Sequence, residues 1–174
     1  MERLEKVYER LKAEAKVTTF IGIDPDVERS GWAVVDRAAR RVIWCRALAF
    51  PSLLEVMANY DPKAVRVIVE ASWLTTKNWH LPKTCSLARA AAMGRSVGRN
   101  HATGEKIVEM CRHMGLDVVE QPPLRKCWRG RDGKITHAEL AQFVDGLPKR
   151  TNQEERDAVL LAWTAARLPI RVKG

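Results

Sequence analysis

Residues 20–35 read FIGIDPDVERSGWAVV and organise the first half of the chain. The β-rich run that contains their first residues ends at Asp24-Pro25, because proline has no N–H to donate to a neighbouring strand. Ser30-Gly31 is typical of a turn, and Trp32 to Val35 resumes the strand pattern. A polar turn and a third β-rich stretch follow. The spacing predicts a meander of antiparallel strands over residues 17–23, 32–35 and 41–49.

The rest of the chain alternates helices with strands. Residues 65–69 form a nearly continuous β-branched run that predicts a strand covered on both faces, and residues 116–120 predict a fifth strand. Helices are predicted over residues 52–60, 83–97, 103–114, 136–144 and 154–168. This order predicts one α/β domain over residues 17–174, with a mixed five-stranded sheet of three antiparallel N-terminal strands and then two parallel ones. Residues 1–16 predict an amphipathic helix as an N-terminal extension.

The composition limits the class of protein. The 174 residues include 30 basic and 21 acidic side chains, which give a formal net charge of +9. Hydrophobic content of 46% and charged content of 29% are globular values and exclude wholesale disorder. No apolar run approaches the ~20 residues of a membrane span, and the first residues lack the apolar block of a signal peptide. The scattered cysteines form no zinc knuckle or compact disulfide framework. We therefore expect a cytoplasmic protein with no membrane partner.

The positive charge gathers in two segments that also contain tryptophan. One segment follows Trp73 and Trp79, and the other surrounds Trp128. The basic residues are Lys77, Lys83, Arg89, Arg95 and Arg99 in the first segment, and Arg125, Lys126, Arg129, Arg131 and Lys134 in the second. Basic side chains interleaved with aromatic rings suit phosphate contacts and base stacking, so we expect a nucleic-acid partner. The alternative is a solvated basic face whose tryptophans belong to the core.

Four carboxylates stand at the ends of predicted elements. Asp24 closes the first strand and Glu70 closes the fourth, and ligands of open α/β sheets bind beyond such strand ends. Glu154 and Asp157 lie three residues apart on the last helix and therefore share a face. Converging carboxylates raise one another's pKa unless cations lie between them. Mg²⁺ binds carboxylate oxygens, and two such ions ~3.5–4 Å apart can hydrolyse a phosphodiester. The set predicts a metal-dependent nuclease.

Each acid also has a structural explanation. An aspartate before proline, such as Asp24, commonly opens a turn, and Glu70 can be a surface acid at a strand end. Glu154 can belong to a capping box at the start of the last helix. The two possible capping boxes are Thr151 with Glu154, and Asn152 with Glu155, of which the second leaves Glu154 free for a metal. The placement of the acids on separate elements, rather than any single acid, carries the prediction.

Three segments resemble the motifs of RuvC-type Holliday junction resolvases, a branch of the RNase H-like superfamily. Residues 20–35 resemble the family's first-strand motif, roughly GIDPGxxxTGxxV. Residues 67–73, VIVEASW, resemble its second acidic strand, including an aromatic residue three positions after the glutamate. Residues 152–162, NQEERDAVLLA, resemble its final helix, where two acids three apart precede a small apolar run. The motifs occur in the family's order between residues 18 and 166.

The resemblance implies an RNase H-like fold and a homodimeric endonuclease that uses two Mg²⁺ or Mn²⁺ ions to nick four-way DNA junctions symmetrically. It carries over Asp24, Glu70, Glu154 and Asp157 as catalytic metal ligands. Trp73 falls where the family has an aromatic residue that engages the opened junction centre. Lys134 or His137 falls near the family's lysine beside the scissile phosphate, and the motif does not decide between them. The nucleic-acid-binding residues of this interpretation are Trp73, Lys77, Lys83, Arg89, Arg125, Lys126, Arg129 and Arg131.

The sequence departs from the family pattern at three points. Asp26 replaces the glycine after the proline, Glu154 stands where aspartate or histidine is more usual, and the stretch after Glu70 is longer than in the bacterial enzymes. Two other functions remain open: an RNase H-like nuclease on other branched or hybrid nucleic acids, and a non-catalytic nucleic-acid-binding module of the same fold. We do not expect an actin-like ATPase, because it needs two such domains and a glycine-rich second phosphate loop, and 174 residues are too few for these.

Overall fold

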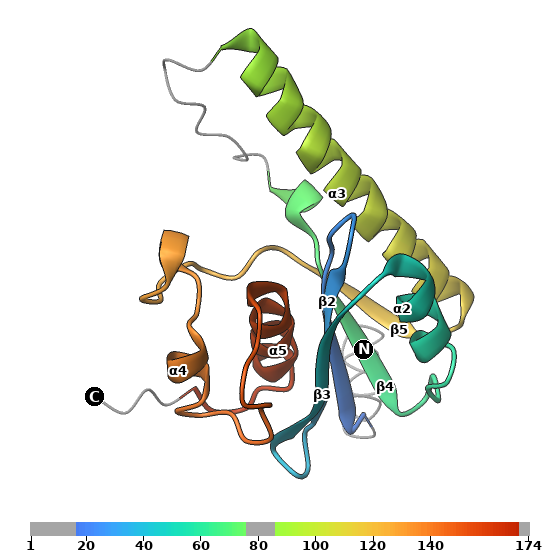
Figure 1. Ribbon diagram of the computed structural model, residues 1–174. Helices are drawn as coiled ribbons and strands as arrows, with labels where there is room; N and C mark the ends of the chain where they lie inside the picture. The colour runs from blue at the N-terminus through green and yellow to red at the C-terminus, as the bar shows by residue number, and fades with distance from the viewer. Residues whose placement is uncertain (1–16, 76–85, 171–174) are drawn as a thin grey trace, which may run out of the picture.

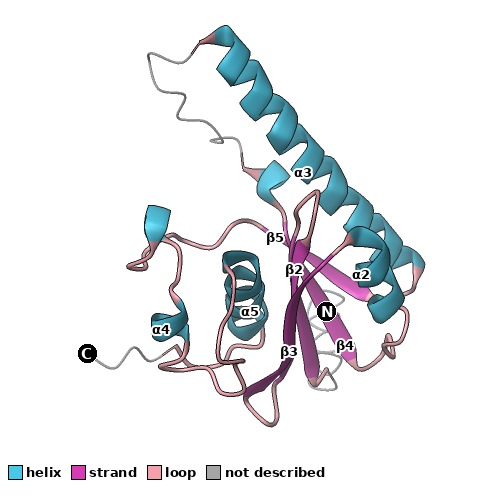
Figure 2. Cartoon of the chain, viewed as in Figure 1, coloured by secondary structure: helices cyan, strands magenta, loops and turns pink. Residues whose placement is uncertain are grey.

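The computed structural model describes residues 17–75 and 86–170 and is built around a five-stranded sheet (Figures 1 and 2). The strands stand in the order β3-β2-β1-β4-β5. β1 pairs antiparallel with β2, as does β2 with β3, whereas β1 with β4 and β4 with β5 are parallel. The strands are β1 (Thr19–Asp24), β2 (Ser30–Asp36), β3 (Arg41–Leu48), β4 (Val65–Glu70) and β5 (Asp117–Gln121). The mixed sheet expected from the sequence is confirmed.

Helices cover both faces of this sheet. The helices are α2 (Phe50–Met57), α3 (Leu87–His113), α4 (His137–Leu140) and α5 (Gln153–Ala165), with short 3-10 turns η1 (Ser72–Leu74) and η2 (Arg131–Gly133). Figure 1 shows α4 and α5 on one side of the sheet and α2 and α3 on the other. The helix expected over residues 1–16 lies outside the described residues. Among the residues that are described, no helix is long and apolar enough to cross a membrane.

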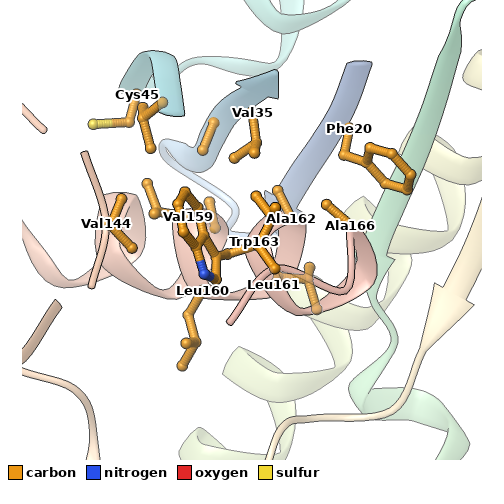
Figure 3. Packing of buried hydrophobic residues seen from close by; sticks show 14 of the residues in the cluster. Phe20, Val35, Cys45, Val144, Val159, Leu160, Leu161, Ala162, Trp163 and Ala166 are labelled. Carbon is orange, nitrogen blue, oxygen red and sulfur yellow. The ribbon is translucent and has the colours of Figure 1, made fainter. Parts of the chain in front are cut away.

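The alternation of side chains along β1 and β4 divides the core into two layers. Ile23 and Val69 pack on the α2 and α3 side, while Phe20 and Ile68 belong to the cluster around α5. Trp163 of α5 lies at the centre of that second cluster (Figure 3). Because successive side chains of a strand point to opposite faces, the residues that follow Ile23 and Val69 point toward α5. These residues are Asp24 and Glu70.

The helices between the strands differ from expectation. The two helices predicted over residues 83–97 and 103–114 are one helix of 27 residues, capped by the Ser86 hydroxyl, which accepts from the N–H of Arg89. The predicted gap between them began at Gly98 and ran to residue 102. A single glycine costs a helix only about 1 kcal/mol, so the helix continues through it. Most residues of the first half of α3 are exposed, and this half projects beyond the sheet (Figure 1).

Two shorter helices also differ. α2 begins at Phe50 and ends at Met57, whereas the sequence predicted a helix over residues 52–60 with Ser52 as its cap; the N-cap is Ala49. Pro51 lies in the first turn, which is compatible with proline because its missing N–H has no intrahelical partner there. The helix predicted over residues 136–144 is limited to α4. The chain beyond α4 turns toward β3, where the N–H of Val42 donates to the carbonyl of Asp145 at 2.8 Å. Because the chain pairs with β3 at Asp145, α4 does not extend to residue 144 as predicted.

Candidate active site

Asp24 and Glu70 end adjacent parallel strands at the same edge of the sheet. Ile23 of β1 is in register with Val69 of β4, so the two acids that follow are neighbours. Both point to the α5 face by the alternation described above. Two strand ends that lie far apart in the sequence therefore present their carboxylates side by side.

Two glycines allow α5 to approach these strands closely. A Cβ added at Gly22 would overlap the carbonyl oxygen of Ala158, and one added at Gly31 would overlap that of Glu154. The backbone of α5 is thus in direct contact with β1 and β2, which brings its first two turns to the sheet edge that holds Asp24. Asp24 is in register with Gly31, so the N-terminal turn of α5 lies over the strand neighbouring Asp24.

The capping of α5 leaves Glu154 outside the cap. The Asn152 side chain accepts from the N–H of Glu155 at 2.8 Å, and the Glu155 carboxylate accepts from the N–H of Asn152 at 3.0 Å. Of the two capping boxes open from the sequence, the structure contains the one formed by Asn152 and Glu155. The carboxylate of Glu154 is therefore not used by this motif.

The charges of the four acids act on one another. Burial raises the pKa of Asp24 well above its ordinary value, and the negative charges of Glu70, Asp157 and Glu154 raise this pKa further, against an opposing effect of Lys134. The pKa of Glu70 is raised by burial and by Asp157, and lowered in part by Lys134 and Lys126. The mutual repulsion expected from the sequence is therefore present at this sheet edge.

Lys134 supplies positive charge inside the cluster. Its Nζ donates to Asp157 Oδ2 at 2.7 Å, and Gln153 Nε2 donates to Asp157 Oδ1 at 2.7 Å. Burial lowers the pKa of Lys134, but the hydrogen bond and charge of Asp157, with the charges of Asp24 and Glu70, outweigh burial and raise that pKa. Gln153 was not singled out in the sequence; its position four residues before Asp157 on one helix was the available signal.

His137 lies elsewhere. Its Nδ1 is 2.8 Å from the hydroxyl of Thr151, so the imidazole joins the start of α4 to the segment before α5. The side chain of Asp26 stabilises the turn after β1, because its Oδ1 accepts hydrogen bonds from the N–H groups of Glu28 and Arg29. This oxygen is therefore already engaged within the turn. Of Lys134 and His137, the structure brings Lys134 to the acids.

The donor set fits a hard divalent cation in its chemistry. Carboxylate oxygens are the ligands that Mg²⁺ and Mn²⁺ prefer. Burial first, and the neighbouring carboxylates second, raise the pKa of Asp24 and of Glu70, and a bound cation would favour the charged forms of both acids. In the part of the chain that the structure describes, no three His, Cys, Asp or Glu side chains already form a metal-binding group. Lys134 instead neutralises Asp157.

A basic pocket adjoins the acids. It has a volume of about 100 Å³, and Glu70 and Asp157 line it together with Arg125, Lys126 and Lys134. Arg125 and Lys126 are exposed, as are Arg129 and Arg131 further along the same loop. Trp128 also lines the pocket, but its ring stacks on Phe143 with centroids 5.9 Å apart and packs against the core around α5. The ring of Trp128 therefore packs against the core, as in the alternative interpretation of the basic segments.

Trp73 follows β4 and is held at its place by three elements. Its indole Nε1 donates to Glu120 Oε2 at 3.0 Å, and Glu120 Oε1 accepts from Arg112 at 2.8 Å. The ring is half-buried against α3, where a Cβ at Gly104 would overlap it. Glu120 was not predicted from the sequence as a partner of Trp73, because its only signal there is its position in the predicted strand over residues 116–120. Arg89 lies on the projecting half of α3, and Lys77 and Lys83 lie outside the described residues.

Solved structures provide the comparison for this fold. One is described as "T. thermophilus RuvC in complex with Holliday junction substrate"; it matches with a TM-score of 0.52 and 16% identity over 86% of this chain and 92% of that one. Another, "Thermus thermophilus RuvC structure", matches with a TM-score of 0.50 and 17% identity over 85% of this chain and 93% of that one. No family model and no curated protein sequence matches. The chain therefore has the RuvC-like, RNase H-like fold.

Proposed function

We propose that the protein is a metal-dependent, structure-selective DNA endonuclease that resolves four-way junctions. The observation that carries the proposal is the gathering of Asp24, Glu70, Glu154 and Asp157 at one sheet edge, next to a pocket lined by Arg125 and Lys126. Acids with raised pKa values favour a divalent cation, and the flanking positive charge favours an anionic polymer. The likeness to a RuvC structure in complex with a Holliday junction substrate supports the substrate class.

In this proposal the four acids hold two Mg²⁺ or Mn²⁺ ions, which would supply an activated water and charge stabilisation for the leaving oxygen. Arg125 and Lys126 bind the phosphates beside the scissile bond. Lys134 neutralises and orients Asp157 before a metal binds, and its ammonium is then available to the scissile phosphate. Trp73 engages unpaired bases where the strands diverge.

A four-way junction has two equivalent strands to cut, so we propose a homodimer that presents two such sites. We expect it to act in the cytoplasm, on branched DNA and without a membrane. The function is tested by incubating the protein with labelled four-way junctions, flaps, duplex and RNA–DNA hybrid, with and without Mg²⁺. Paired symmetric nicks in the junction alone are expected, and D24N is the control that removes one metal ligand. Cleavage of the hybrid, with the junction left intact, would assign the site to the alternative nuclease.

One observation favours a second candidate, a non-catalytic nucleic-acid-binding module. Lys134 forms an ion pair with Asp157. Among the described residues, no three His, Cys, Asp or Glu side chains are arranged to hold a metal ion. In such a module the lysine is a permanent replacement for the cation. Junction binding that leaves every strand uncut across a range of Mg²⁺ and Mn²⁺ concentrations would support this candidate over the endonuclease.

A further inference from the structure

A second basic surface lies on the other side of the acids, along the edge strand β3. Two adjoining hollows, with volumes of about 370 Å³ and about 380 Å³, share Arg46 and Glu155 among their lining residues. Arg150 lines the first hollow and Arg29 the second. We call these two hollows together the β3 groove.

The β3 groove combines exposed aromatic surface with positive charge. Trp44 lines it and is 54% exposed, and the guanidinium of Arg46 lies 5.9 Å from the centroid of the Trp44 ring. Three arginines line the groove against one acid, Glu155, whose carboxylate is already engaged in the cap of α5. The four consecutive residues 43–46 all line the first hollow, so it follows the edge of the strand rather than one face.

The register of the sheet connects this groove with the acids. Asp24 is paired with Gly31, and Gly31 with Ala47, which lines the second hollow. The groove therefore begins two strand spacings from Asp24, about 10 Å. At most about three nucleotides cover that distance, because B-form nucleotides are ~3.4 Å apart and unstacked nucleotides are further apart. Asn152, the N-cap residue of α5, lines the same hollow and marks its border with the acid cluster.

We propose that the β3 groove binds the stretch of nucleic-acid strand that flanks the nucleotides presented to Asp24 and Glu70. Arg29, Arg46 and Arg150 contact its phosphates, and Trp44 stacks on an unpaired base. This combination of a cationic groove with an exposed aromatic ring suits a strand with unstacked bases. The path of this strand past the acids rests on the proposed function. With the β3 groove included, basic residues would bind the strand on both sides of the acids, Arg125 on one side and Arg46 on the other.

The test measures binding without cleavage. A labelled four-way junction and a labelled single strand are titrated with the full chain in Ca²⁺, and fluorescence anisotropy gives affinity against salt concentration. We expect R46E/R150E to weaken binding at least tenfold. For the single strand it should reduce the steepness of log K against log salt by about 1.4, because two phosphate contacts at ~0.7 each are lost. W44A should weaken single-strand binding about tenfold with little change in salt slope, because stacking is not ionic.

The matched control is R40E/K63E. Arg40 and Lys63 are exposed and lie just before the starts of β3 and β4, at the ends of these strands opposite to Ala47 and Glu70. Their reversal changes the net charge by the same amount as R46E/R150E. If this control weakens binding as much as R46E/R150E does, general charge explains the effect and the proposal is overturned. A change in the oligomeric state of W44A, measured by analytical ultracentrifugation, with DNA affinity unchanged would also overturn it.

These readouts separate the groove from the proposed function. A wild-type protein that binds but never cuts, with the differences between variants preserved, would refute the endonuclease and support the groove. Junction cleavage by wild type together with unaltered binding by R46E/R150E and W44A would refute the groove and leave the endonuclease standing. Trp44, Arg46 and Arg150 are exposed, so we expect all variants to retain the circular dichroism spectrum of the wild type.

Discussion

The ammonium of Lys134 and the carboxylate of Asp157 form an ion pair at 2.7 Å that joins the loop after β5 to the first turns of α5. The side chain of Asp157 is 16% exposed and that of Lys134 is 37% exposed, so solvent screens the pair only in part. The same lysine lowers the pKa values of Asp24 and Glu70. Lys134 therefore compensates three acids that come from three different elements.

Replacing Lys134 by methionine should expose this compensation. Without the ammonium, the pKa values of Asp24 and Glu70 rise further, so ionising these carboxyls costs the folded state more. We expect K134M to lose stability at neutral pH and to recover most of it near pH 4, where the carboxyls are protonated. Melting temperatures of wild type and K134M across this range test the expectation. A constant difference at every pH would mean that Lys134 contributes through packing alone.

The metal-free protein should become more stable when Asp24 is changed to asparagine. Its pKa is raised by folding, so above its ordinary value of 3.8 the unfolded chain releases the proton before the folded protein does, and stability falls as pH rises through this window. D24N removes that loss and should raise the melting temperature at neutral pH, by about 2–4 °C for each kcal/mol recovered. The same variant should bind junctions and fail to cut them. A lower melting temperature would contradict the pKa assignment.

The glycine contacts under α5 give a prediction about geometry. G31A places a methyl group against the backbone of Glu154, so the start of α5 must move away from Gly31 and thereby change the position of Glu154 in the acid cluster. We expect a loss of about 1–3 kcal/mol in the free energy of unfolding, as for other overpacked sites, and loss of cleavage. The matched control is G98A, because nothing lies within 4 Å of an added Cβ on that exposed part of α3. G98A should raise stability by up to about 1 kcal/mol through helix propensity, with cleavage unaltered.

Trp73 combines a structural and a proposed binding role, and two substitutions separate them. W73A should lower the free energy of unfolding by about 2 kcal/mol or more, because it removes a half-buried ring and leaves Glu120 without its indole donor. W73F keeps an aromatic face and should cost about 1 kcal/mol. Opening of the junction centre, measured by 2-aminopurine fluorescence, should be lost in W73A and kept in W73F. If W73A opens the junction centre as well as W73F does, base stacking by Trp73 is excluded.

Much of the fold could be predicted from local patterns. The β-branched runs, the proline after Asp24 and the intervening helices specify where the strands lie along the chain, because strand propensity and chain breaks depend on neighbouring residues. The long helix α3 could not be predicted, since its continuation through Gly98 depends on a balance of small energies over many turns. The end of α4 was likewise decided by a hydrogen bond to Val42, far away in the sequence.

The sequence by itself determined which acids stand at the ends of elements, because a strand end or a helix start is a local property. Only the tertiary structure decided that Lys134, rather than His137, forms a hydrogen bond with Asp157. It also decided that Trp73 donates a hydrogen bond to Glu120 and that Trp128 stacks on Phe143. These pairings depend on which side chains the packed helices bring within hydrogen-bonding or van der Waals distance. Residue spacing along a chain does not encode that distance, because it depends on how closely helices approach the sheet: α5 at Gly22 and Gly31 on one face, and α3 at Gly104, beside Trp73, on the other.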